Sequence, residues 1–352
     1  MSVPASILQG QRIAAAQAAA RAELERLRER EAGQVSRLLD RLADELSGLL
    51  AGHVNTDGSV PPEALALLEP LLLALIEQLM ADWRDSLAAA TVAAVTTGAA
   101  AAGLTGVAVT SAVQRALAFL DAYRAADGLL LSDRLWRISS GMQDDLLTLL
   151  RTGVTQGADA ARLVEQLLAA GQPVPPHLAA QSRYGDLSAL SARLRESLTG
   201  QGGSARHVME RLVRTEMNRA HTETFIIGLG DTPGVAGVKF RLSPLHPRYD
   251  ICDLYASANL HGLGPGVYPL GSHPYPAHPN TLSYLVPVFI DEISDEDRAG
   301  QETAFDWLRQ RSPADQDGVL GGKRKGEAFR AGQLLPDELR WPWWAIEQRL
   351  GG

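Results

Sequence analysis

The side chains best suited to chemistry lie between positions 246 and 278. They combine imidazoles, carboxylates and the sole cysteine of the chain. The candidate metal ligands are His246, Asp250, Cys252, Asp253, His273 and His278. Zinc takes about four N, S or O ligands, and closed structural sites are rich in Cys and His. Cys252 with His278 and one of the other four could therefore bind zinc.

The single cysteine also supports a metal-free interpretation of the same residues. Cys252 cannot form an internal disulfide and cannot build a thiolate-rich site by itself. We expect hydrogen bonding and packing instead, with His278 as a loop histidine and Asp250 as a turn or cap residue that holds backbone amides. No cofactor is expected on this interpretation, and zinc is the alternative.

A second group of polar residues follows a helix that Ser204 can cap. Arg214, Asn218 and His221 are four and three residues apart, so they lie on neighbouring positions of one face. An enzyme is the alternative function here, because Arg214, Glu216, His221 and Asp250 could form a hydrolase or a nucleotidyl- or ADP-ribosyl-type transferase pocket. However, the sequence has no Ser nucleophile elbow, Walker loop, His-Glu-x-x-His or deaminase signature. We therefore expect no catalytic residues.

The closely spaced glycines Gly262, Gly264 and Gly266 do not indicate a nucleotide-binding loop. They follow no predicted strand and open no predicted helix, and Pro265 removes one of the amides that a phosphate would need. The spacing predicts a tight turn.

Most of the chain must position these residues through helices. Apolar residues recur at three and four residues from Arg12 to Leu50, which predicts an amphipathic helix or hairpin, and a second helix follows Pro61 and Pro62. Further helices are predicted over Val113–Ala126, Asp133–Thr152 and Ala158–Ala169, with another before Gly200. Short strands are predicted over Val235–Leu242 and Tyr284–Ile290, and helical signals return after Asp291.

The stretch from Ser86 to Gln114 has no charged side chain and is long enough to span a bilayer. It is built from Ala, Thr and Gly, whereas membrane insertion is driven mainly by Leu, Ile, Phe and Val. We expect a packed Ala-rich helix, or a helix pair broken near Gly103, and membrane association is not expected. A membrane span is the alternative.

The overall charge gives no general field for coating nucleic acid, because 41 acidic residues face 33 basic ones and the net charge is -8. A transient DNA contact at Lys323-Arg324-Lys325 is an alternative to a solvated loop, although three charges neutralise few phosphates. The N-terminus shows no secretory signal, and the lone cysteine fits a reducing cytoplasm.

The motifs described so far occur in a distinctive order. An Arg214-Thr215-Glu216 helix precedes an Asp250-Ile251-Cys252 segment, and a His278-Pro279-Asn280 segment follows. Over about 131–332, this order resembles the phage Mu F-like minor head family, also called phage head morphogenesis proteins. The residues that carry the resemblance are Arg214, Glu216, Asn218, Asp250, Cys252, Tyr255, Gly264, Gly266, His278 and Pro279.

The resemblance implies a minor capsid protein of a tailed bacteriophage that acts in procapsid assembly, DNA packaging or DNA delivery. Its implied partners are the portal protein and a scaffold or major capsid protein, and self-association of the N-terminal helices is a further option. The implied location is the virion head, after assembly in the host cytoplasm. Many relatives carry cysteines just after the His-Pro-Asn segment, where this chain has Thr281 and Ser283, so the implied metal site lacks ligands here.

We expect an α+β fold: a mainly helical N-terminal region, then a small mixed α/β module with short strands and irregular loops, and a helical end. Residues 1–130 form the N-terminal region, which serves partner or self association. Residues 131–230 are the helical part of the head morphogenesis domain, 231–290 the compact loop-rich module, and 291–352 the C-terminal helical segment.

Overall fold

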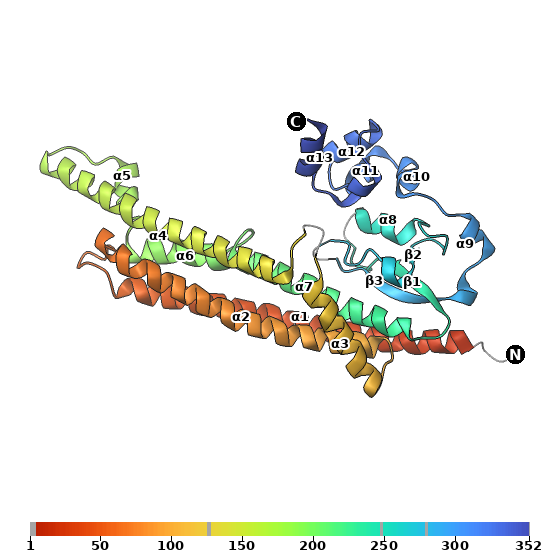
Figure 1. Ribbon diagram of the computed structural model, residues 1–352. Helices are drawn as coiled ribbons and strands as arrows, with labels where there is room; N and C mark the ends of the chain where they lie inside the picture. Colours follow the sequence, from red (N-terminus) through yellow and green to blue (C-terminus); the bar gives the residue numbers. More distant parts are fainter. Residues whose placement is uncertain (1–4, 125–127, 247–248, 279–280, 352) are drawn as a thin grey trace. The chain divides into compact units, whose positions relative to one another are not determined.

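The computed structural model describes residues 5–124, 128–246, 249–278 and 281–351 (Figure 1). The chain is 70% helical with one small antiparallel sheet, which confirms the expected α+β fold. Its contacts divide it into two units. One unit consists of Arg28–Ala90 and Leu131–Val213, and the other of Met1–Leu27, Thr91–Leu130 and Arg214–Gly352. The units differ from the four consecutive segments expected above, because three long helices run from one unit into the other.

These three helices are α1 (Ala5–Ala51), α2 (Leu65–Ala101, after the 3-10 turn η1, Pro62–Ala64) and α7 (Ala205–Gly230). Helix α1 is continuous rather than a hairpin. The uncharged stretch at 86–114 is divided between α2 and α3 (Val107–Ala122). This division agrees with the expected helix pair broken near Gly103.

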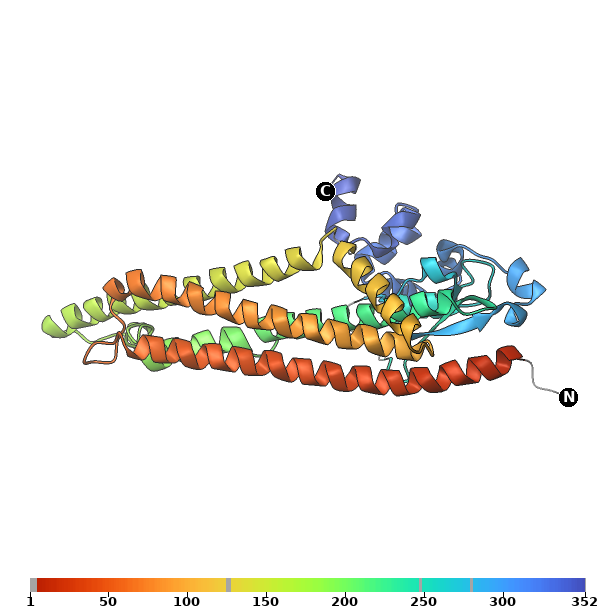
Figure 2. The same cartoon turned by 60° about the horizontal axis from the view of Figure 1, so that its bottom comes forward.

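The first unit is a helical bundle. It contains parts of α1, α2 and α7 together with α4 (Leu131–Ala169), α5 (Pro176–Gln181) and α6 (Leu187–Thr199), and Figure 2 shows α1 and α2 running alongside each other. Leucines of α1, α2, α4 and α6 surround one small interior void, among them Leu46, Leu68, Leu150 and Leu194. Burial of these apolar stripes is what stabilises the bundle.

Helix α4 is a single helix where two were predicted over 133–152 and 158–169. Gly153 and Gly157 fall in the interval between the two predicted helices, but both are buried inside the helix. A Cβ atom on Gly157 would lie 2.4 Å from the backbone N of Gly185, so the missing side chain lets the loop before α6 approach. Tertiary packing therefore outweighs the low helix propensity of glycine.

The stretch Pro62–Ala101 is long and apolar enough to cross a membrane by length and composition. One third (33%) of its most apolar window is buried. Leu68, Leu72, Ile76 and Trp83 of this stretch are among the fully buried side chains.

The second unit is built around a three-stranded antiparallel sheet of order β2-β1-β3, with β1 (Val235–Arg241) in the centre. Strand β2 (Val267–Tyr268) was not predicted, while β3 (Tyr284–Phe289) and β1 lie within one residue of expectation. The register places Arg241 opposite Tyr284 and Lys239 opposite Val286. Because side chains alternate across a strand, Lys239 and Arg241 share one face and buried Phe240 takes the other.

Short helices between and after the strands complete this unit. They are α8 (Ile251–Ser257), η2 (Leu270–Ser272), η3 (Ile290–Glu292), α9 (Asp295–Ala299), α10 (Ala304–Arg309), α11 (Pro313–Val319), α12 (Lys323–Arg330), η4 (Pro336–Arg340) and α13 (Trp343–Leu350). Trp307, Val319, Phe329 and Ile346 from this region join the same core as Phe240. The helices predicted after Asp291 are therefore confirmed.

The basic run expected to lie in a loop forms the first turn of α12. Lys325 is buried, and its Nζ donates hydrogen bonds to the carbonyl oxygens of Leu339 (2.7 Å) and Trp341 (2.9 Å). Burial lowers the pKa of Lys325 to about 8. Of the three basic residues, only Lys323 and Arg324 are therefore exposed to solvent, because the ammonium group of Lys325 is bound to backbone carbonyls.

Candidate functional site

The start of α8 fixes two of the candidate carboxylates. Asp250 is the N-cap, and its Oδ1 accepts a hydrogen bond from the backbone N of Cys252 at 2.7 Å. Asp253 completes a capping box, since its Oδ2 accepts from the backbone N of Asp250 at 2.8 Å. The cap role expected for Asp250 is confirmed, and the box satisfies amides that the helix leaves free.

Two imidazoles contact these carboxylates. His246 Nε2 lies 2.9 Å from Oδ2 of Asp253 and 3.9 Å from Oδ1 of Asp250. His278 Nε2 lies 3.5 Å from Oδ2 of Asp250. Burial alone would raise the pKa of Asp250, but hydrogen bonds from His278 and the Cys252 amide, with the two nearby imidazoles, lower it below its usual value.

The thiol joins this cluster to α7. Cys252 Sγ is buried, 3.3 Å from His278 Nε2 and 3.6 Å from Thr281 Oγ1. Asn218 of α7 donates its side-chain NH₂ to the Thr281 carbonyl at 3.3 Å. We call Asn218, Asp250, Cys252, His278 and Thr281 the pin cluster, because it ties α7, α8 and the segment before β3 together.

The other residues that carry the resemblance have local structural partners. Tyr255 is buried, and its carbonyl accepts a hydrogen bond from the Tyr268 hydroxyl at 3.0 Å. Gly264 and Gly266 have positive φ, and a Cβ on Gly266 would lie 2.3 Å from the Ala256 carbonyl oxygen. The expected tight turn is therefore present. Pro279 lies outside the described residues.

The positions of these donor atoms bear on whether the side chains could ligate a metal ion. Two groups of potential donors, Asp250/Cys252/His278 and His246/Asp250/Asp253, each have their donor atoms within 4.8 Å of one another. Sulfur, imidazole and carboxylate suit a borderline metal such as zinc. At the position of the expected cysteines, however, Thr281 and Ser283 supply hydroxyls, and both carboxylates already accept backbone hydrogen bonds. Hydrogen bonds thus account for the positions of these side chains without a metal ion.

His273 belongs to neither group of donors. Its Nε2 lies 3.8 Å from Oε1 of Glu223 on α7, a residue that the sequence analysis did not single out. Burial raises the pKa of Glu223 to about 7, against the influence of Arg219, and lowers the pKa of His273 to about 4. Burial thus disfavours the charged form of both groups, and because His273 is neutral near pH 7 we interpret the 3.8 Å approach as contact rather than as an ion pair. Only the fold reveals it, since fifty positions separate the two in the sequence.

The pin cluster lies beside a hollow of about 590 Å³ lined by Tyr249, Asp250 and His278 together with the end of α11. A thiol, an imidazole and a carboxylate could in principle form a nucleophilic triad. A triad needs the nucleophile on one ring nitrogen and the carboxylate on the other. Here Cys252 and Asp250 both approach Nε2 of His278, and the thiol is buried. The arrangement does not provide that relay.

The residues of the alternative enzyme pocket each have structural partners. Glu216 and Arg219 form a buried ion pair, with the Arg219 guanidinium 4.3 Å from the ring centre of Tyr123. His221 Nδ1 lies 3.0 Å from Thr97 Oγ1, and burial lowers the pKa of His221 to about 4. An imidazole held neutral and buried is a poor proton shuttle near neutral pH.

Comparison with family models, curated proteins and solved structures gave no match.

Proposed function

We propose that this chain is a minor head protein of a tailed bacteriophage, a structural component without catalytic activity. Its role on this proposal is procapsid assembly, DNA packaging or DNA delivery, in association with the portal. The observation that carries the proposal is the pin cluster. Asn218, Cys252 and His278 come from the three segments on which the family resemblance depends; Cys252 contacts His278 directly, and Thr281 connects Asn218 to Cys252 within the same unit.

The chemistry of the cluster favours a structural role over an enzymatic one. Asp250 caps a helix, Cys252 is buried, and His278 contacts both through the same nitrogen. Residues used in this way hold segments together, because each hydrogen bond between them restricts a loop or helix start. On this proposal, the pin cluster is a scaffold for a surface that contacts other head proteins.

The helical bundle supplies candidate surfaces for such partners. Leu67 and Leu71 are exposed one turn apart on α2, and Trp136 and Leu168 are exposed on α4. Exposed apolar side chains on long helices suit docking to helical partners, either the portal, a scaffold or major capsid protein, or a second copy of the chain. The proposed location is the virion head, after assembly in the host cytoplasm.

Mass spectrometry of purified particles and empty procapsids tests the proposal. The sample comes from the phage whose genome encodes this chain, and a replication protein from the same genome serves as the negative control. We expect peptides of this chain in both particle types at low abundance relative to the major capsid protein. Absence from both, with the major capsid protein detected, would contradict the proposal.

A further inference from the structure

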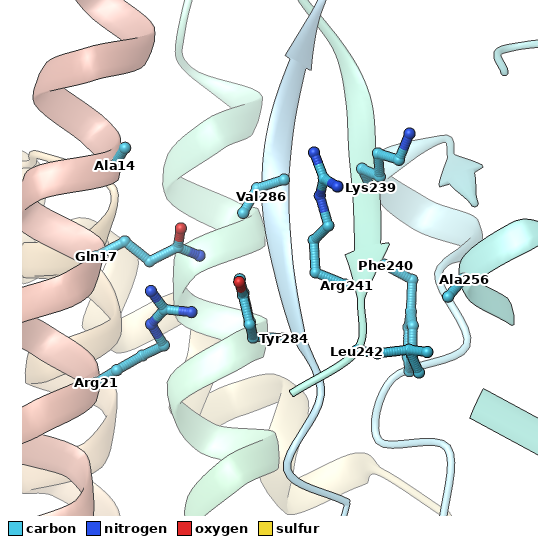
Figure 3. A pocket seen from close by; sticks show the side chains of 10 residues that line it. All are labelled: Ala14, Gln17, Arg21, Lys239, Phe240, Arg241, Leu242, Ala256, Tyr284 and Val286. Carbon is cyan, nitrogen blue, oxygen red and sulfur yellow. The ribbon is translucent and has the colours of Figure 1, made fainter. Parts of the chain in front are cut away.

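A cavity of about 570 Å³ lies against the sheet, lined by α1, β1, β3 and Ala256 of α8 (Figure 3). Its lining carries three cations from two elements, Arg21 of α1 with Lys239 and Arg241 of β1. Gln17 and Tyr284 add polar groups, and the lining residues that the structure describes include no carboxylate. Such an excess of positive charge is a local feature, because the whole chain carries a net charge of -8.

The two strand cations are only partly neutralised by the fold, through the carboxylate of Asp297 near Lys239. Lys239 and Arg241 are neighbours on one face of β1, and Arg241 forms no ion pair within the described part of the chain. Burial and the charge of Arg241 lower the pKa of Lys239, while Asp297 raises it. Asp297 is itself occupied as a cap residue, accepting hydrogen bonds from the Ser294 N (2.9 Å) and Oγ (2.7 Å). An incoming anion would therefore relieve repulsion between these cations.

The third cation is held in place beside the cavity. The Arg21 guanidinium lies 3.9 Å from the ring centre of Tyr284, and Gln17, one turn away on α1, donates a hydrogen bond to the carbonyl of Leu285. Figure 3 shows Gln17 and Arg21 projecting from the same side of α1 toward β3. Fixed cations cost little ordering on binding, and guanidinium groups match the oxygens of phosphate.

The basic run on α12 offers a weaker site by the same criteria. Lys323 lies 3.7 Å from Glu327, Arg324 lies 3.7 Å from Glu347, and the Nζ of Lys325 is bound to backbone carbonyls. Each of these charges already has an acceptor. Of these two basic groups, the cavity is therefore the better candidate for an anion site.

We propose that this cavity binds a phosphate group, carried either by a small molecule such as a nucleotide or by a nucleic acid strand. Lys239 and Arg241 contact the phosphate oxygens, and Arg21 closes the third side. The volume falls in the range of small-ligand sites, about 300–1,000 Å³. The proposal does not depend on the head-protein role, because it uses only the sheet, α1 and their charges.

Lysine acetylation of the intact full-length chain tests the site directly. The chain offers Lys239, Lys323 and Lys325, so exposed Lys323 is an internal reference in the same molecule. The probes are inorganic pyrophosphate and, separately, a short oligothymidylate. We expect either probe to reduce acetylation of Lys239 severalfold while Lys323 stays unchanged. Equal acetylation of Lys239 with and without both probes would overturn the proposal.

Charge-removing variants then locate the binding of a fluorescein-labelled oligothymidylate or, by calorimetry, of pyrophosphate. The double variant Lys239→Gln/Arg241→Gln should weaken binding of the protecting probe about tenfold or more, since hydrogen bonds to charged groups contribute about 1.5–3 kcal/mol. The matched control Lys323→Gln/Arg324→Gln removes the same charge and should bind as the unmodified chain does. A loss confined to the control would overturn the proposal.

A check of folding and a charge-conserving variant accompany these binding measurements. Circular dichroism reports whether the double variant is folded, and Arg241→Gln alone serves if it is not, because Arg241 is exposed. Arg241→Lys retains the positive charge and should bind the probe with most of the affinity of the unmodified chain. Protection by pyrophosphate alone assigns the site to a free phosphate compound, and protection by the oligonucleotide alone assigns it to a strand; both outcomes support phosphate binding.

Discussion

Cys252 Sγ lies 3.3 Å from Nε2 of His278, so the first turn of α8 is joined to the segment before β3 by a side-chain contact across 26 positions. The Cys252 thiol is buried, and Nε2 of His278 also approaches the Asp250 carboxylate. A network of this kind stabilises more than its individual contacts suggest, because each member orients the next.

Removal of the imidazole from this contact should destabilise the fold. His278→Ala leaves Cys252 and Asp250 without that partner, and we expect the free energy of unfolding to fall by about 1–3 kcal/mol. Urea unfolding followed by circular dichroism measures the change. His177→Ala, on an exposed histidine, is the control and should change the free energy by less than about 0.5 kcal/mol. Equal stability of the two variants would contradict the role of the cluster.

Metal analysis of the same purified proteins separates two explanations of that loss. Hydrogen bonding alone predicts that zinc measured by mass spectrometry stays well below one equivalent in the unmodified chain and does not change in Cys252→Ala. A stoichiometric zinc content that Cys252→Ala abolishes would show that the donors of the pin cluster hold a metal.

The pKa of Asp250 predicts a dependence of stability on acid. Because the folded pKa lies below the usual value of 3.8, the carboxylate contributes stability above about pH 4 and loses it as the pH falls through the folded pKa. Asp250→Asn should therefore be less stable than the unmodified chain at pH 7, by about 1 kcal/mol, and the difference should shrink as the pH falls below about 4. Asp295→Asn, on a fully exposed side chain, should show no such closing difference. Urea unfolding at a series of pH values measures it.

The buried Glu223 predicts the opposite dependence. Its folded pKa is raised to about 7 from 4.5, so the stability of the neutral form is fully present below about pH 4.5 and is lost as the pH rises through about 7. Glu223→Gln cannot ionise and should be more stable than the unmodified chain at pH 8, by on the order of 2 kcal/mol, with little difference at pH 4.5. Thermal unfolding at the two pH values checks this. Glu29→Gln, on an exposed residue of α1, should not alter the pH dependence.

Two glycines of α4 should respond with opposite sign to the same substitution. Gly157→Ala places a methyl group 2.4 Å from the Gly185 backbone N, and we expect a loss of about 2 kcal/mol or more. Gly141→Ala meets no atom within 4 Å and should gain up to about 1 kcal/mol, because alanine favours a helix. Urea unfolding of both variants measures the pair. A stabilised Gly157→Ala would show that α4 and the Gly185 loop are not in close contact.

The sequence by itself determined the kind of elements and several local roles. Periodic leucines predict amphipathic helices at α1 and α2, and short runs of strand-forming residues predict β1 and β3. Asp250 was expected as a turn or cap residue, although the helix α8 that it caps was not predicted. These features depend on residues a few positions apart, so local physics is sufficient to predict them.

Only the tertiary structure decided which distant residues meet. Helix α4 continues through Gly153 and Gly157 because neighbouring side chains pack against the first and a neighbouring backbone against the second, and Lys325 leaves the surface because two carbonyls receive its ammonium group. The contact of Cys252 with His278, the raised pKa of Glu223 and the convergence of Arg21 with Lys239 and Arg241 all depend on long-range packing. Burial and proximity across the chain set these properties, and neither is encoded in short-range spacing.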